Sequence, residues 1–464
     1  MSDHDHDVSE SSEGPEERQD LYTRRRLLRT GGTIGLGVAG AGLLGASGSA
    51  AAATASASSI KPGLGKQLAD LLGVTDHDAK LVANKTWKLG GCLPLTGQGA
   101  SYGITQGRGV QLAIEHIALA GGPKIDYLQY DNLSGSAAAG AQIGRELGAQ
   151  NVGAQMTSFI AVLGAEVPSI SQYKIMTFDG GGGVGAFPGK PYYWGSRAQP
   201  PQQIFNGEFA WLAKAHPKMK RVLFVFNDEG AATTQSYLSS IKPALAKAGQ
   251  TMVGQVLFPY GATDFSSTVT AIQAAPQFDV IKLVAYGTDS GYFMKQYAAA
   301  GLKTQVLGSE LTKDALGIAG AAYEGLWIAF DYFDYNSPPN PLSKIFVNSF
   351  KSKWGALEPD NYFTANYYES TLGLWELMRR VARKGGDINS GTALQSALLA
   401  NPTLASVYGG TSHTVGSMTF NKKTHGLISR PCGVFVVKSG NPKLLATFNL
   451  SPPPSYQLKI VASS

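Results

Sequence analysis

Cysteine is scarce in this chain, since only Cys92 and Cys432 occur among its 464 residues. A fold held together by several disulfides is therefore excluded. No Cys–His pair and no metal-ligand spacing are present, so we expect neither a metal nor another cofactor. Sequence alone does not establish that the two cysteines are close together, and we expect two buried free thiols.

Charge is also low, at 16% of the residues with a net charge of +6. Lys and Arg are scattered after the N-terminal region and no phosphate-binding loop with a Lys is present, so no nucleic-acid partner is expected. The hydrophobic share of 43% is ample for a sizeable core. A chain of this length is expected to form two domains.

The N-terminal 57 residues are typical of an export signal. The segment TRRRLLR at 23–29 precedes a mildly apolar run at 31–46 and a small-residue tract at 47–57. This order predicts a twin-arginine signal peptide over 1–57 and a periplasmic, cell-surface or extracellular location. A membrane anchor is the alternative because the run approaches spanning length, but its Gly and Ala make a poor anchor. No cysteine lies at the cleavage region, so no lipid anchor is expected.

The rest of the chain alternates between strands and helices. Residues 58–84 are expected to form a linker with one short helix at 66–72. Strands are then expected at 87–93, 125–130, 152–156, 174–178, 221–226, 252–258, 280–285, 305–307, 325–330, 433–437 and 444–448. Helices are expected at 107–119, 136–147, 160–171, 202–215, 234–248, 265–274, 290–300, 341–354, 365–384 and 392–399. Repeated β–α units indicate an α/β fold with parallel sheets, and two successive runs indicate two such domains.

The loop after the first strand is a candidate binding element. It places Thr96, Ser101 and Tyr102 between a strand end and a helix N-terminus. Free N–H groups and the helix dipole suit an anionic group there, and Tyr102 can supply an aromatic wall. An ordinary βα loop is the alternative.

The same loop contains GASYG at 99–103, which matches the G-x-S-x-G motif of serine hydrolases. Ser101 would be the nucleophile, with His413 or His425 as its base. Residues 94–98 separate the strand from Ser101, which disfavours the sharp turn that this motif needs. A hydrolase is therefore kept only as a remote alternative, and we expect no enzyme.

Polar groups follow several other strands. Ser158 ends the third strand and the glycines at 180–183 end the fourth, and hydroxyls with successive backbone N–H groups suit a carboxylate. In the second half, residues 227–229 and 286–290 follow strands. A solvated helix N-cap is the alternative for Asp228 and Glu229.

The segment GLKTQVLGSE at 301–310 ends in Glu310, the acidic residue that most strongly indicates a binding site. A helix ends there, a buried strand follows, and Glu310 lies just past the strand's carboxyl end. Ligands bind at this edge of open α/β sheets. A lone carboxylate there can hold a cation such as an ammonium group by a charge-assisted hydrogen bond.

Three segments resemble a known family. They are KLGGCLPLTGQGASYG at 88–103, AYGTDSGYFMKQYAAAGLKTQVLGSE at 285–310 and GSMTFNKKTHGLISRPCGVFVVKSGNPKLLA at 416–446. Together they resemble the periplasmic substrate-binding proteins of ABC transporters, in the leucine/isoleucine/valine family. The resemblance covers about residues 85–450.

The resemblance implies a type I periplasmic binding fold, which has two Rossmann-like lobes, parallel sheets and a three-crossover hinge. Lobe one would comprise 85–200 and 332–412, and lobe two 201–331 and 413–464. The implied partners are a small-molecule ligand, held between the lobes, and an ABC transporter permease. We expect a monomer. The two cysteines would lie in different lobes, where a bridge would restrain closure, so no disulfide is expected.

The family also implies roles for individual residues. Ser158 and the turn of Gly180, Gly181 and Gly182 match the site of the ligand carboxylate. Tyr102 matches an aromatic residue that lines the cleft, and Glu310 matches the acid that binds the ligand ammonium.

Two departures from the family alter the expected side-chain pocket. Ala231-Ala232 and Thr288-Asp289-Ser290 stand where amino-acid binders carry aromatic residues. We therefore expect Asp289 to line a roomier, more polar pocket. An amino acid or a similar compound is the expected ligand. An aromatic or other carboxylate, an amide or a urea-type solute stays open, and so does a sensing role.

Overall fold

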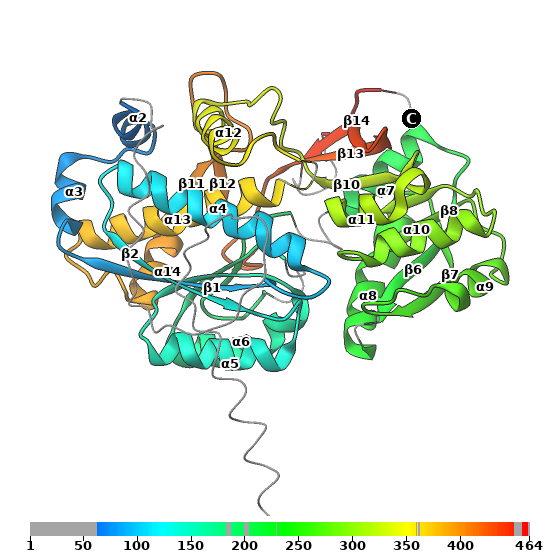
Figure 1. Ribbon diagram of the computed structural model, residues 1–464, viewed down its shortest axis with the longest axis horizontal. Coiled ribbons are helices and arrows are strands. Elements are labelled where there is room, and N and C mark those ends of the chain that lie inside the picture. The colour runs from blue at the N-terminus through cyan, green and yellow to red at the C-terminus, as the bar shows by residue number, and fades with distance from the viewer. Residues whose placement is uncertain are drawn as a thin grey trace, which may run out of the picture. The chain divides into compact units, whose positions relative to one another are not determined.

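The computed structural model describes residues 63–181, 187–198, 204–228, 230–358, 360, 362–449 and 457–462 (Figure 1). The expected signal peptide at 1–57 and Gly182 lie outside these residues. Every strand and helix expected after residue 85 is present in the structure. No described helix is both long and apolar enough to cross a membrane.

The segment before residue 85 holds two helices, α2 (Leu64–Leu71) and α3 (Asp76–Val82), where a linker with one helix was expected. A capping box between Thr75 and Asp78 begins α3, and Leu68 is fully buried. Asp78 binds Arg383 through two hydrogen bonds of 2.5 and 2.7 Å, and Arg379 donates to the carbonyls of residues 72 and 73. The two helices are therefore docked on the body of the protein.

We expect Asp78→Asn to lower the free energy of unfolding by about 1–2 kcal/mol at neutral pH, because a charge-assisted pair with Arg383 is lost. The hydrogen bond from Arg383 holds the pKa of Asp78 well below its usual range. The pair's contribution to the free energy of unfolding is complete above the unfolded-state pKa of Asp78 and is lost as the pH falls through its folded-state pKa. Urea denaturation across this range checks the prediction, with the exposed Asp76→Asn as control. A deficit that persists in strong acid contradicts it.

The first sheet, sheet A, is fully parallel and has the order β2-β1-β3-β4-β5. Its strands are β1 (Thr86–Leu93), β2 (Lys124–Asp131), β3 (Ala154–Thr157), β4 (Met176–Asp179) and β5 (Tyr193–Gly195). Its connecting helices are α4 (Ala100–Leu119), α5 (Ala137–Ala149) and α6 (Ile160–Tyr173). The short β5 lies in the segment that was expected to be a loop.

Helix α4 begins at Ala100, seven residues before the expected start, so Ser101 and Tyr102 lie in its first turn. Gly103 made this stretch resemble a loop, but close packing explains this glycine. A Cβ on Gly103 would lie 2.0 Å from the carbonyl oxygen of Pro94.

The second sheet, sheet B, is mixed, because antiparallel strands extend its parallel strands at one edge. Its order is β15-β14-β13-β10-β9-β8-β6-β7. The parallel strands are β6 (Arg221–Asp228), β7 (Thr251–Pro259), β8 (Val280–Val284), β9 (Val306–Gly308) and β10 (Trp327–Asp331). The antiparallel strands are β13 (Pro431–Lys438), β14 (Asn441–Asn449) and β15 (Lys459–Ile460). Ser439 and Gly440, both with positive φ, join β13 to β14 in a tight hairpin.

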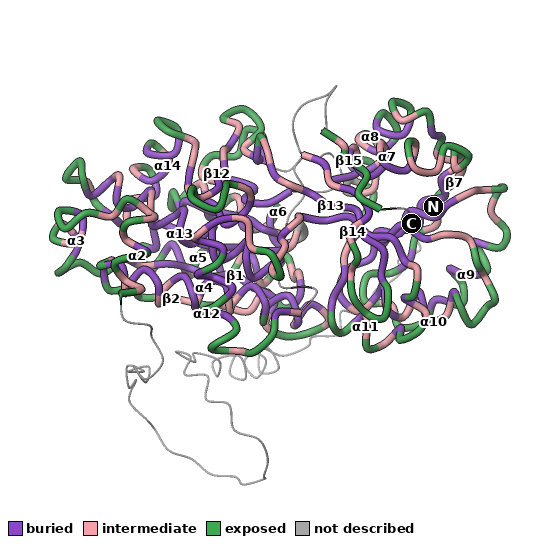
Figure 2. Tube along the Cα trace, turned by 90° about the horizontal axis from the view of Figure 1, so that it is seen from above, coloured by how far each residue is buried: buried purple, intermediate pink, exposed green. Residues whose placement is uncertain are grey.

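The helices between these strands are α7 (Ile204–Ala215), α8 (Ala231–Lys247), α9 (Ser266–Gln273), α10 (Asp289–Ala299), α11 (Lys313–Ala319) and the 3-10 helix η2 (Gly320–Tyr323). After β10 come α12 (Pro341–Trp354), α13 (Tyr362–Arg383), α14 (Gly391–Ala400) and a hairpin of β11 (Thr403–Ser406) with β12 (Gly416–Thr419). Helix α13 packs on α4 and is buried along most of its length (Figure 2).

The chain passes between sheets A and B three times: after β5, after β10 and before β13. This agrees with the three-crossover fold that the resemblance implies. The expected boundary at 412/413 falls inside the β11–β12 hairpin, and the chain rejoins sheet B only at Pro431. Cys92 in β1 and Cys432 in β13 are both free and buried, on different sheets.

Candidate functional site

Glu310 follows β9 directly, and its side chain is only 11% exposed. The Tyr102 hydroxyl donates a 2.5 Å hydrogen bond to its Oε2, and the backbone N–H of Gly287 donates to that hydroxyl at 2.6 Å. Burial raises the pKa of Glu310, while Arg197 and Tyr102 act in the opposite direction. The structure thus brings together two predicted site residues that are 208 positions apart.

Arg197 is a buried residue at this site that sequence reasoning missed. Its Nη1 lies 3.7 Å from Glu310 Oε1, and its Nε lies 3.3 Å from Asp331 Oδ2. Nη1 also donates to the carbonyl oxygen of Gly180 at 3.2 Å, and the guanidinium lies over the ring of Phe363 at 4.8 Å. One side chain therefore touches both predicted halves of the site, Gly180 and Glu310.

Ser158 lies at the end of β3 and is buried. Its Oγ accepts a 2.9 Å hydrogen bond from Nε2 of Gln106, a second residue that sequence reasoning missed. Gln106 stands four positions after Tyr102, so both lie on one face of α4. This helical spacing is the signal from which Gln106 could have been found.

The glycine turn lies beside Ser158, but its described N–H groups already have partners. A Cβ on Gly181 would meet Ser158 Oγ at 2.5 Å, so only glycine fits there. The N–H of Gly181 donates to Asp179 at 2.6 Å, and that of Gly180 donates to the carbonyl of Thr157 at 3.4 Å. The Ser158 hydroxyl and the Gln106 amide are therefore side-chain groups beside this turn that could bind an anion.

Aromatic rings surround Tyr102. Phe159 lies edge-to-face with Tyr102 at 5.9 Å and with Tyr260 at 6.5 Å, and Phe363 lies edge-to-face with Tyr102 at 5.1 Å. Phe159 has φ 77°, a strained conformation for a bulky residue. Sequence reasoning placed none of Phe159, Tyr260 and Phe363 here. These rings are suited to excluding water from the polar groups around them.

Asp289 is the first residue of α10 and is buried. Its Oδ2 accepts a 3.0 Å hydrogen bond from the N–H of Gly261. Its Oδ1 has no hydrogen-bond partner in the described part of the chain. Burial raises the pKa of Asp289 to about 7. None of its hydrogen bonds joins it to Glu310 or Ser158.

The two histidines proposed as the base for Ser101 lie in other environments, since one contacts other residues and the other is exposed. His425 stacks on Trp194 with ring centroids 3.9 Å apart, and its Nδ1 lies 3.0 Å from the carbonyl oxygen of Tyr193. His413 is exposed in a turn, whereas Ser101 is buried in α4. Among the described residues, no group of three or more His, Cys, Asp and Glu is placed to hold a metal ion.

Comparison with known proteins agrees with this architecture. A family model described as "Periplasmic binding protein" matches residues 86–441. Leu/Ile/Val-binding protein homolog 7 of Brucella abortus is 26% identical over 334 residues, which cover 68% of this chain and 80% of that protein.

Solved structures share the fold. The leucine-binding protein LivK of Thermotoga maritima is 21% identical, with a TM-score of 0.65 over 78% of this chain and 98% of that one. A solute-binding protein of R. palustris in complex with benzoate is 19% identical, with a TM-score of 0.66 over 82% and 98%. LivJ of Streptococcus pneumoniae, in complex with isoleucine, is 20% identical, with a TM-score of 0.65 over 79% and 100%.

The chain belongs to the periplasmic binding protein family, and its fold is the type I fold of these solute-binding proteins. The family resemblance inferred from sequence is confirmed.

Proposed function

We propose that this protein captures an amino acid or a similar zwitterion for an ABC importer. The largely buried Glu310 carboxylate, held by Tyr102 at a strand end, is the observation that carries the proposal. The names of LivK, LivJ and the Brucella relative, which refer to leucine, isoleucine and valine, support it.

In the proposed binding mode, the two charged ends of the ligand meet different parts of the site. The ammonium binds Glu310, and the carboxylate approaches Ser158 Oγ and the Gln106 amide. The rings of Phe159 and Phe363 exclude water, which strengthens both interactions. Two lobes, one built on sheet A and one on sheet B, close around the ligand by hinge motion, the usual movement of periplasmic binding proteins.

A thermal-shift screen of amino acids, amides and aromatic acids tests the proposal, because a specific ligand raises the melting temperature. We expect Glu310→Gln to weaken the binding of an amino acid about 10- to 100-fold, since a hydrogen bond between two charged groups is lost. Isothermal titration calorimetry measures this loss. Glu115→Gln, which removes the partner of Lys353 on the exposed face of α4, is the matched control. Equal affinities of Glu310→Gln and the native protein for every amino acid contradict the proposed role.

A carboxylate without an amine is the second candidate ligand. The aromatic rings around Tyr102 suit a benzene ring, and the R. palustris relative was solved with benzoate. An aromatic acid that stabilises the native protein and Glu310→Gln equally would support this candidate.

We also propose that residues 1–57 are a twin-arginine signal peptide that directs export to the periplasm or the cell surface. The permease of an ABC transporter would then receive the ligand from a monomeric protein.

A further inference from the structure

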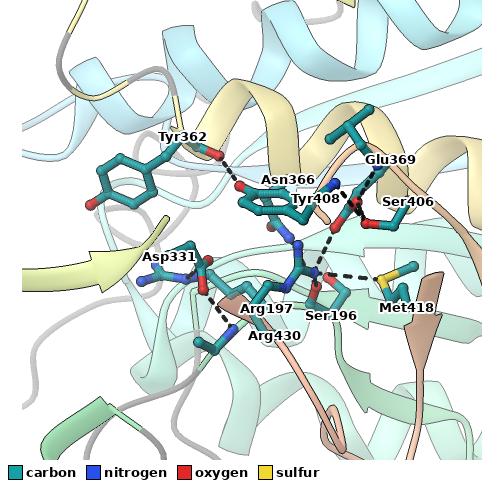
Figure 3. Close-up of polar contacts among 12 residues, drawn as sticks. Ser196, Arg197, Asp331, Tyr362, Asn366, Glu369, Ser406, Tyr408, Met418 and Arg430 are labelled. Atoms are coloured by element: carbon teal, nitrogen blue, oxygen red, sulfur yellow. Dashed lines mark hydrogen bonds and ion pairs between the residues drawn. The ribbon is translucent and has the colours of Figure 1, made fainter. Parts of the chain in front are cut away.

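Arg197 lies between two carboxylates, those of Glu310 and Asp331, which follow or end different strands of sheet B. Asp331 ends β10 at the second crossover, where it is fully buried. Glu310 follows β9 and faces Tyr102. Figure 3 shows Arg197 and Asp331 pointing toward one another, with Arg430 and its own partners beside them.

The charges in this cluster do not balance. The groups that face Glu310 are the phenols of Tyr102 and Tyr362, the guanidinium of Arg197 and the carboxylate of Asp331. Arg430, the next cation, forms a 2.6 Å ion pair with Glu369. Among the described residues, one guanidinium therefore serves two largely buried carboxylates, and an unbalanced buried charge is costly.

The distances assign the surplus charge to Glu310. Asp331 lies 3.3 Å from Arg197 Nε, and it also accepts a 3.1 Å hydrogen bond from the N–H of Ala198. Glu310 lies 3.7 Å from Arg197 Nη1, and Tyr102 is its hydrogen-bond donor. Arg197 is thus the closer counter-ion of Asp331.

We propose that Arg197 is a positioning residue that neutralises Asp331 and leaves Glu310 one cation short, so that the site selects ligands bearing one ammonium group. This rests on the proposed function and names the specificity of the same site. A proton fills the vacancy on Glu310 in the free protein, and the ligand ammonium expels it. The raised pKa of Glu310, caused by burial, agrees with this exchange. Affinity for an amine therefore falls as the pH falls through the pKa of Glu310 in the free protein.

Calorimetry in two buffers of different ionisation enthalpy tests the exchange, with L-isoleucine as the probe. Below the free-protein pKa of Glu310, the native protein should release about one proton per ligand bound. Asp331→Asn leaves Arg197 to Glu310 alone. It should lower the affinity about 10- to 100-fold and reduce the proton release to near zero, although Asp331 is not expected to touch the ligand.

Two variants separate this effect from structural damage. Asp279→Asn removes a carboxylate from an ion pair with Arg221 at the far end of β6, and it should change neither quantity. Arg197→Lys keeps the positive charge beside Asp331 and should retain the proton release, even if its affinity is lower.

Infrared difference spectroscopy tests the ligand-free protein. Native protein minus Glu310→Gln should show the carbonyl stretch of one protonated carboxyl group, which should be missing in Asp331→Asn. Absence of that band, or proton release that is unchanged in Asp331→Asn, overturns the inference and leaves the proposed function standing. If the band is present but no amino acid binds, the proposed function fails, and the ammonium specificity fails with it.

Discussion

Replacing Glu208 by Ala is expected to lower the free energy of unfolding by about 3–5 kcal/mol, because it leaves the Lys282 ammonium buried without its counter-ion. Both side chains are fully buried. Lys282 Nζ lies 2.8 and 2.9 Å from the two Glu208 oxygens, donates to the carbonyl of Gly308 at 3.0 Å and lies over the ring of Phe205. The pair thus ties α7 to β8 and β9 inside sheet B.

The double variant Glu208→Leu/Lys282→Met is the control for this prediction. Removing both charges and filling their space should restore most of the stability. Asp70→Ala, which breaks the exposed pair with Lys66, should cost no more than about 0.5 kcal/mol. Denaturant titrations of the variants measure all three values. A double variant as unstable as Glu208→Ala contradicts the argument from the unpaired charge.

Glu369→Ala is the second change for which a large loss of stability is expected, also about 3–5 kcal/mol. Glu369 of α13 pairs with Arg430 at 2.6 Å, and its Oε2 accepts hydrogen bonds from Ser406 and from the N–H of Val407 (Figure 3). Arg430 precedes β13 and donates to the carbonyl of Ser196 after β5. The contacts that Glu369→Ala removes therefore lie where two of the three crossovers meet.

The partner variant Arg430→Met should be less harmful, because the remaining carboxyl can take up a proton. Burial raises the pKa of Glu369, and Arg430 opposes that shift in the native protein. In Arg430→Met the folded state then binds more protons than the unfolded state, so stability should fall as the pH rises between the two pKa values. Denaturation at several pH values checks this slope. Stability of Arg430→Met that rises with pH in that range contradicts it.

Local sequence patterns were sufficient to predict the alternating elements and the position of Glu310 just after a strand, because both depend on neighbouring residues. Arg197 could not be predicted in this way. Its partners lie 17 positions away at Gly180 and far along the chain at Glu310 and Asp331, so only the folded crossovers bring them together. Phe159 was missed for a different reason, since its positive φ aims the ring in a direction that the sequence does not reveal.

Sheet B shows the same limit. The strands β13 and β14 were predicted from their apolar runs, but the antiparallel addition of β13 to β10 depends on how the chain returns from the β11–β12 hairpin. The early start of α4 was missed because Gly103 is typical of a loop until its packing against the Pro94 carbonyl is known.

The two hydrogen bonds of the Tyr102 hydroxyl make ligand binding an exchange rather than a simple gain. The free protein already links α4 to the residues after β8 and β9 through Gly287 and Glu310. An incoming ammonium must either share Glu310 with the phenol or replace it, so the measured affinity is the difference between new and old contacts. A neutral solute of the same shape would break the same hydrogen bonds but form weaker ones with Glu310. Selectivity for an ammonium group can therefore arise from the hydrogen bonds that the ligand-free site already contains.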